Sequence, residues 1–301
     1  MFEDLEKKLK LIHKPSQIEP WIELQYTEAE DIHKLIEFGN ALTNLSSLNA
    51  LRQPYFFRGQ ANSDWRLEPK IYRLVKGIAK EWGLRIEFDS IKYFKQQAHL
   101  FLSPQLIPRD NNIGAWLALM QQYSAPTRML DWTTSFYVAL YFVVNDEPLD
   151  RDGALWFFGI HKLLEWMRRY KNLSDTQLNN ILSDEKEFVD FGLNKAQPRI
   201  DGFESDIKSE RMVPQQSVFT YCETLFCDHA ELIGHALWDL YKQDQKTFPL
   251  TKIIVSADAK NKLREHLNKL NLTASTLFPG IDGVGRSISE IIRVQCEVFH
   301  H

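Results

Sequence analysis

The sequence predicts a mixed α+β fold, in which the strands of one mixed central sheet alternate irregularly with helices packed on it. Short apolar and aromatic runs bounded by turn residues are typical of buried strands, and Gly153–Ile160 (GALWFFGI) is the clearest example. Longer stretches repeat apolar side chains at helical spacing, as Phe88–Leu102 does. Because the two kinds of segment do not alternate strictly, a regular doubly wound sheet is not expected.

The N-terminal region, residues 1–49, is expected to be a helical preamble to the main domain. Thr27-Glu28-Ala29-Glu30 is a capping box, and apolar side chains follow it at helical spacing. Residues 50–301 are then expected to form the α+β domain with a helical C-terminal part.

Further elements follow along the chain from the same patterns. Runs that are short and apolar are predicted as strands at Tyr55–Arg58, Gly153–Ile160, Val218–Cys222 and Ile253–Ser256. Periodic runs are predicted as helices at Phe88–Leu102, from Ser174, at His229–Tyr241, at Lys260–Leu270 and at Ile288–Val294. The charged stretch Gln197–Met212 is expected to be an exposed loop. The glycines between Gly280 and Gly285 are expected to form a turn that leads into a helix starting near Ser287.

The composition limits the classes of protein to which the chain can belong. Hydrophobic residues make up 44% and charged residues 25% of the 301 residues, as in ordinary globular proteins. The net charge of −4 argues against a general nucleic-acid coat protein and leaves room for a local basic patch, so nucleic acid stays possible as a partner. No stretch approaches the roughly 20 apolar residues that span a bilayer, so no membrane partner is expected. The N-terminus lacks a secretory signal and only three cysteines are present, so a reduced cytoplasmic protein is expected.

The segment Gln121–Val144 (QQYSAPTRMLDWTTSFYVALYFVV) combines a polar first half with an apolar second half. Pro126 disfavours helix at the preceding residue, so the first half is predicted to be a turn or loop. Phe136–Val144 is continuously apolar and is predicted to be buried. A polar loop braced by a buried element holds functional groups in fixed geometry. The alternative is that Arg128 and Asp131 form only a structural ion pair.

The chain resembles the FRG-domain family, a prokaryotic and phage family, through Phe57-Arg58-Gly59 and the segment just described. The family's second motif is matched by Tyr123, Pro126, Thr127, Arg128, Leu130, Asp131, Trp132, Thr133, Ala139, Leu140, Tyr141 and Phe142. Gln122 stands where the family usually has His, and Ser124 where it has Gly. A looser match covers Arg211, Gln215, Gln216, Val218 and Phe219, with Ser217 in a usual Gly position, and Leu277–Ile288 is similar to the family's C-terminal signature.

The resemblance implies an ADP-ribosyltransferase-like fold and NAD as cofactor, in an effector that acts on an unknown macromolecule in toxicity or phage defence. The residues that would bind the dinucleotide are Arg58, Gln60, Tyr123, Thr127, Arg128, Thr133, Arg211 and Gln216, with Asp131 orienting them from behind. An arginine fork suits phosphate, a tyrosine ring stacks on a base, and threonine hydroxyls suit ribose. The Arg58 strand end, the Tyr123–Thr133 loop and the Arg211–Gln216 segment are expected to line one cleft.

No catalytic acid is assigned. Glu210 and Glu223 flank the Val218–Cys222 strand, where a transferase would carry its acid, but neither lies in a recognisable motif. The competing hypothesis is therefore a non-catalytic module that binds a nucleotide, a nucleic-acid end or a peptide in the same cleft. Cys222, Cys227 and His229 do not match the spacing of a structural zinc site, so no metal is expected.

Overall fold

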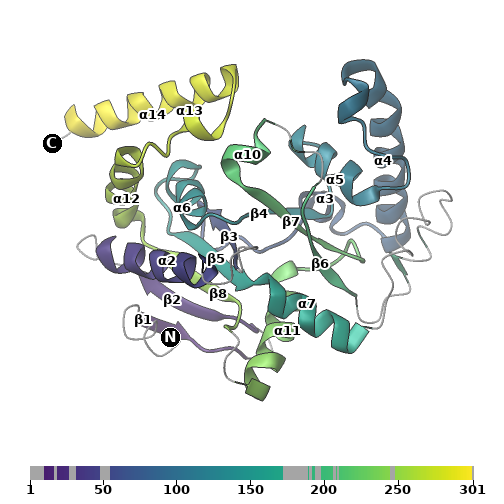
Figure 1. Cartoon of the computed structure of the whole chain (residues 1–301), viewed down its shortest axis with the longest axis horizontal. Coiled ribbons are helices and arrows are strands. Elements are labelled where there is room, and N and C mark those ends of the chain that lie inside the picture. Colours follow the sequence, from purple (N-terminus) through teal and green to yellow (C-terminus); the bar gives the residue numbers. More distant parts are fainter. Residues whose placement is uncertain are drawn as a thin grey trace.

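The computed structural model describes residues 10–16, 19–26, 32–47, 55–171, 189, 192–193, 198–205, 208, 210–244 and 248–299. Within these residues one eight-stranded sheet runs through the molecule in the order β1-β2-β8-β5-β3-β4-β7-β6 (Figure 1). The strands are β1 Lys10–His13, β2 Ile22–Tyr26, β3 Tyr55–Gln60, β4 Met129–Thr133, β5 Gly153–Gly159, β6 Ile200–Phe203, β7 Ser217–Cys222 and β8 Thr251–Val255. Neighbours pair antiparallel except β2 and β8, which are parallel. The predicted α+β class with a mixed central sheet is confirmed.

Helices pack on both faces of the sheet (Figure 1). They are α2 Ile32–Ser47, α3 Lys70–Val75, α4 Lys80–Phe101, α5 Ile113–Gln122, α6 Phe136–Asn145, α7 Ile160–Lys171, α10 Met212–Gln215, α11 His229–Asp244, α12 Ala257–Lys269, α13 Ala274–Leu277 and α14 Ile281–Phe299, with a 3₁₀ turn at Pro104–Leu106. Helices α2, α6 and α12 share one apolar cluster with β3, β5 and β8, whereas α7 and α11 pack on the opposite face. Within the described residues, no helix is both long and apolar enough to cross a membrane.

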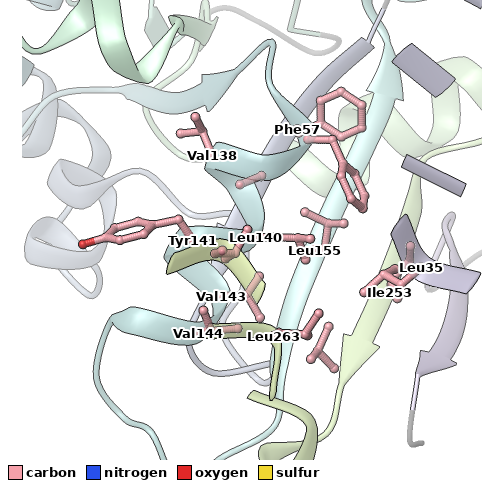
Figure 2. Close-up of a cluster of buried hydrophobic side chains, with 14 of the residues drawn as sticks. Leu35, Phe57, Val138, Leu140, Tyr141, Val143, Val144, Leu155, Ile253 and Leu263 are labelled. Atoms are coloured by element: carbon pink, nitrogen blue, oxygen red, sulfur yellow. The ribbon is translucent and has the colours of Figure 1, made fainter. Parts of the chain in front are cut away.

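The core on the α6 face is built around the apolar run that follows the polar segment. Phe136–Val144, predicted to be buried, lies in α6, whose side chains meet Phe57 of β3 and Leu155 of β5 (Figure 2). Adjacent strand residues point to opposite faces, so Phe56 packs in the cluster beneath α7 and α11 while Phe57 packs against α6. The helix that follows the motif is thereby anchored on the strand that carries Arg58.

The N-terminal region differs from the expected helical preamble. It contains the helix α2, but it also contributes β1 and β2, and β2 pairs with β8 from Ile22 opposite Thr251 to Tyr26 opposite Val255. The cause is visible in the alternation Ile22, Leu24 and Tyr26, all buried, which is a strand period. The capping box at residues 27–30 lies outside the described residues.

Three other expectations are corrected. The stretch predicted as an exposed loop, Gln197–Met212, contains β6, which pairs with β7. The first half of the polar segment contains the strand β4. Helix α14 begins at Ile281 rather than near Ser287, so Gly283 and Gly285 are helical residues and not a turn. The helix predicted from Ser174 lies outside the described residues.

Candidate functional site

A separation in the sheet between β3 and β4 positions the site. Strand β3 pairs with β5 from Tyr55 to Gln60, but with β4 it pairs only at Phe57 opposite Thr133. Beyond that pair, Arg58 Nη1 donates to the backbone oxygen of Asp131 over 2.6 Å. A side chain thus bonds a β4 carbonyl where the two strands no longer form a ladder.

A pocket of about 290 Å³ lies beside this separation. Its charged lining residues are Arg58, Arg211, Asp131 and Asp146, and its amides are Gln121, Gln122 and Gln215. Phe57, Trp132, Phe142, Phe219 and Phe278 contribute aromatic surface. The three segments expected to line one cleft therefore meet, since Arg58, Thr133 and Arg211 all border this pocket.

Arg58 is half-buried and incompletely hydrogen-bonded. Its Nε atom is inaccessible to solvent and has no hydrogen-bond partner among the described residues. Burial lowers the pKa of the guanidinium, while the carboxylates of Asp131 and Asp146 oppose that shift. The group still remains a cation, because the arginine pKa lies far above neutrality. Nη1 of Arg58 is thus fixed on β4, while the buried Nε is left without an acceptor among the described residues.

Asp146 is a pocket residue that the sequence did not single out. It caps the C-terminal end of α6 and stands just beyond the matched motif. Burial raises the pKa of its carboxyl, and the positive charges of Arg286, Arg58 and Arg293 act against that rise. The only sequence signal is an acidic residue directly after a buried apolar helix, at an end where the helix dipole disfavours negative charge.

The third wall comes from the C-terminal half of the chain. Arg211 Nη2 donates to Asp282 of α14, and Gln215 Nε2 donates to the backbone oxygen of Leu277 over 3.0 Å. Thr133 Oγ1 donates to the backbone oxygen of Gln215 over 2.7 Å, which ties this wall to β4. The two looser family matches therefore pack on each other at the pocket.

Both departures from the family's second motif lie at the pocket. Gln122 and Ser124 line it, and Ser124 has a φ of 63°, in the left-handed region that glycine adopts most easily. This conformation explains why glycine is usual there. Gln216, next to the other unusual serine, also has a left-handed φ of 47°.

Five of the sequence-predicted binding residues do not line the pocket. Gln60 accepts from Trp156 Nε1, Thr127 donates to Gln121 Oε1, and Gln216 accepts from Thr134 Oγ1. Tyr123 is 56% exposed, next to the pocket but outside its lining. The fifth, Arg128, is buried just before β4 begins and does not border the pocket.

Arg128 pairs with Glu87 of α4, not with Asp131. Its Nε donates to Glu87 Oε1 over 2.7 Å, and Nη1 donates to the backbone oxygen of Glu223 over 2.7 Å. The ion pair with Asp131 does not form, because Arg128 stands before β4 and pairs with Glu87, whereas Asp131 lies within the strand. Asp131 instead accepts from Gln121 Nε2 over 2.8 Å at the pocket.

A buried polar network lies on the other face of the sheet near Arg58. Thr220 Oγ1 accepts from Trp132 Nε1 over 2.8 Å and contacts His229 Nδ1 over 2.9 Å. A hydroxyl both donates and accepts, so this contact is compatible with a neutral His229 in either tautomer. Burial, together with the positive charge of Arg58, lowers the His229 pKa to about 3.

We expect this histidine to make the fold sensitive to acid. The unfolded chain takes up the proton below pH 6.5, whereas folded His229 stays neutral to about pH 3. Stability is therefore complete above the unfolded pKa and falls with decreasing pH, by at most about 1.4 kcal/mol per pH unit. His229→Asn keeps a hydrogen-bonding group for Thr220 and removes the titration. The free energy of unfolding, measured with urea at several pH values in this window, should change less with pH in the variant than in the wild type. An equal change with pH would contradict the assignment.

Neither glutamate that flanks β7 borders the pocket. Glu210 is exposed, and Glu223 is buried, where its Oε2 accepts from the backbone nitrogen of Arg199. Cys222 and Cys227 are free thiols. Across the part of the chain that the structure describes, no three His, Cys, Asp or Glu side chains are grouped to hold a metal ion.

Comparison with known proteins gives one match. The family model described as FRG domain matches residues 53–152, which span β3 to the end of the loop after α6 and include Arg58, Asp131 and Asp146. Neither the curated proteins nor the solved structures give a match. The matched span contains both motifs that shape two walls of the pocket. Residues 53–152 are thus an FRG domain, and the chain is an FRG-domain protein.

Proposed function

We propose that the pocket binds a nucleotide, with NAD the first ligand to test, and that the protein is an ADP-ribosyltransferase-like effector acting on a macromolecule in toxicity or phage defence. The observation that carries the proposal is the incomplete hydrogen bonding of the Arg58 guanidinium. Its Nη1 is held by β4, its buried Nε has no partner among the described residues, and the residue lines the pocket. A guanidinium fixed at a pocket wall binds phosphate oxygens with defined geometry.

The rest of the lining suits the same ligand class. Aromatic side chains offer stacking surface to a base, and the amides of Gln121 and Gln122 offer hydrogen bonds to ribose or to a base edge. The volume of about 290 Å³ is near the lower limit of small-molecule pockets, about 300–1,000 Å³. It therefore suits one mononucleotide half of a dinucleotide, with the other half lying outside.

Bound NAD would supply the ADP-ribose unit, with nicotinamide as the leaving group. Breaking that bond develops positive charge on the ribose, which a nearby carboxylate stabilises. Asp131 and Asp146 are the carboxylates that border the pocket. Asp131 already accepts from Gln121, so Asp146 is the better candidate for this role. Glu210 and Glu223 lie elsewhere and are not proposed for it.

The second candidate is a non-catalytic binding module. The observation that favours it is that no glutamate is found among the described residues lining the pocket. In this case the same arginine and aromatic surface hold a nucleotide, a nucleic-acid end or a peptide without bond cleavage. Binding and transfer must therefore be measured separately.

Arg58→Lys is expected to weaken binding of NAD and ADP-ribose at least about tenfold, because lysine keeps the charge and loses the fork. Isothermal titration calorimetry measures the affinity, and thermal unfolding should show only the small loss of one hydrogen bond, about 1 kcal/mol. Arg66→Lys is the matched control, since Arg66 pairs with Asp228 and Glu231 away from the pocket lining. Equal affinities in wild type and Arg58→Lys would remove Arg58 from the site.

Asp146→Asn separates catalysis from binding in the same design. Wild-type protein incubated with labelled NAD and cell lysate is expected to label a protein or a nucleic acid. The variant should bind NAD and lose labelling, because the amide cannot stabilise the developing charge. Binding without labelling by wild type would favour the non-catalytic module. Absence of both binding and labelling would overturn the nucleotide proposal.

A further inference from the structure

Helix α14 exposes a stripe of isoleucine and valine side chains along its outward face. Ile281 is 82% exposed, and each of the others is more than half exposed. The stripe consists of Ile281, Val284, Ile288, Ile291 and Ile292. These positions lie within an arc of about 100° on a helix of 3.6 residues per turn. In Figure 1 α14 runs along the edge of the molecule, so the stripe is a surface feature.

The orientation of the stripe is fixed by the opposite face of the same helix. Glu290 is buried there, where it accepts from the Tyr141 hydroxyl and from the backbone nitrogen of Ala274. A side chain at Gly283 would meet the backbone oxygen of Phe278 at 1.8 Å, so this turn of the helix packs directly on the chain. Rotation of α14 to bury the stripe would break these contacts.

Gly285 supplies an independent observation. It lies inside α14, where glycine weakens a helix relative to alanine, and a side chain there would have no neighbour within 4 Å. Nothing in the described chain therefore requires glycine at this position. A second helix crossing at close range does require a small residue, and Ser289, one turn later, is small and exposed as well.

We propose that the outward face of α14 is the contact through which two copies of this chain pair. The residues within or next to the stripe on the described part of the helix are uncharged: Gly285, Ser287, Ser289, Gln295 and Cys296. The exposed charged residues Asp282 and Arg286 lie farther around the helix. An isologous contact places a surface against itself, so a neutral stripe pairs with its own copy without repulsion between like charges. A partner that recognised this surface by charge would require charged residues around the stripe. Ile281, Val284, Ile288 and Ile291 also follow the 3–4 spacing typical of paired helices.

The test is the oligomeric state of the full chain in solution. Sedimentation equilibrium should give a concentration-dependent dimer for wild type. Ile288→Glu should raise its dissociation constant at least about a hundredfold, because each copy would place an unpaired carboxylate in an apolar contact. Tyr93→Glu is the matched control: Tyr93 of α4 is 66% exposed, away from the stripe, and its replacement should leave the dimer intact.

A second variant does not depend on added charge. Gly285→Gln has open space in the single chain, so circular dichroism and thermal unfolding should show a folded protein. It should nevertheless weaken the dimer, because the longer side chain keeps the two helices apart. A wild-type chain that stays monomeric overturns the proposal and leaves the stripe to another protein. A dimer that survives both Ile288→Glu and Gly285→Gln overturns it equally.

Discussion

Replacing Arg128 with methionine is expected to lower the free energy of unfolding by about 3–5 kcal/mol. The substitution leaves Glu87 as a buried, unpaired carboxylate and removes the donors that satisfy the backbone oxygens of Cys222 and Glu223. Glu87 is 1% exposed and cannot regain hydration without opening α4 away from the sheet. The effect is large because the Glu87 carboxylate would have neither an ion partner nor contact with water.

Urea unfolding of a double-mutant cycle tests this assignment. Glu87→Leu combined with Arg128→Met should be more stable than either single variant, because removing both charges leaves no unpaired ion. Asp131→Asn is the matched control and should change stability little, since Asp131 is exposed and accepts from Gln121. Additive losses in the cycle would show that Arg128 and Glu87 do not act as a pair.

The Arg128 result bears on how the motif is interpreted. The sequence groups Arg128 and Asp131 as neighbours in a polar loop, and that grouping predicts a mutual brace. Because Met129–Thr133 is a strand, consecutive residues alternate between the two faces of the sheet, and Arg128 stands just before the strand begins. The alternation cannot be recognised in the sequence, because apolar residues are buried on both faces of the strand. Leu130 and Trp132 are buried on one face, and Met129 is buried on the other. Motif membership therefore indicates a folded unit, and not that each member binds a ligand.

Strands β3, β5, β7 and β8 could be predicted from the sequence, whereas β1, β2, β4 and β6 could not. Strands β3, β5, β7 and β8 are apolar runs, because each pairs with a strand on both sides. Strands β1 and β6 are four-residue edge strands, which carry little local signal and exist only through pairing with β2 and β7. Their formation depends on neighbours that local periodicity does not contain.

The pocket itself was predictable only in part. Arg58, Thr133 and Arg211 could be singled out because polar residues beside buried apolar runs are unusual. Asp146 could not, because its place in the pocket follows from the packing of α6 on β3 rather than from any local pattern. That packing has one strict requirement in the sequence, which is the glycine of Phe57-Arg58-Gly59.

Gly59→Ala is expected to destabilise the protein by about 3 kcal/mol or more, at the upper end of overpacking effects. An added Cβ would lie 1.9 Å from the backbone oxygen of Ala139 and 2.9 Å from the backbone nitrogen of Val143. Both atoms belong to the backbone of α6, so no side-chain rotation relieves the clash and the helix must move off β3. The core of Figure 2, where Val138, Leu140 and Leu155 meet, would then open.

The same displacement should weaken the pocket, because Arg58 adjoins Gly59 and Asp146 ends the displaced helix. Chemical denaturation measures the stability, and calorimetry with NAD measures the ligand site. Gly285→Ala, measured at protein concentrations where the chain is monomeric, is the matched control: it is also a glycine-to-alanine change, at a helix position with no neighbour within 4 Å, and should stabilise the fold by up to about 1 kcal/mol. If Gly59→Ala were as stable as wild type, α6 would not be held at this distance from β3. The glycine would then have to serve the ligand directly, which full stability with lost NAD affinity would reveal.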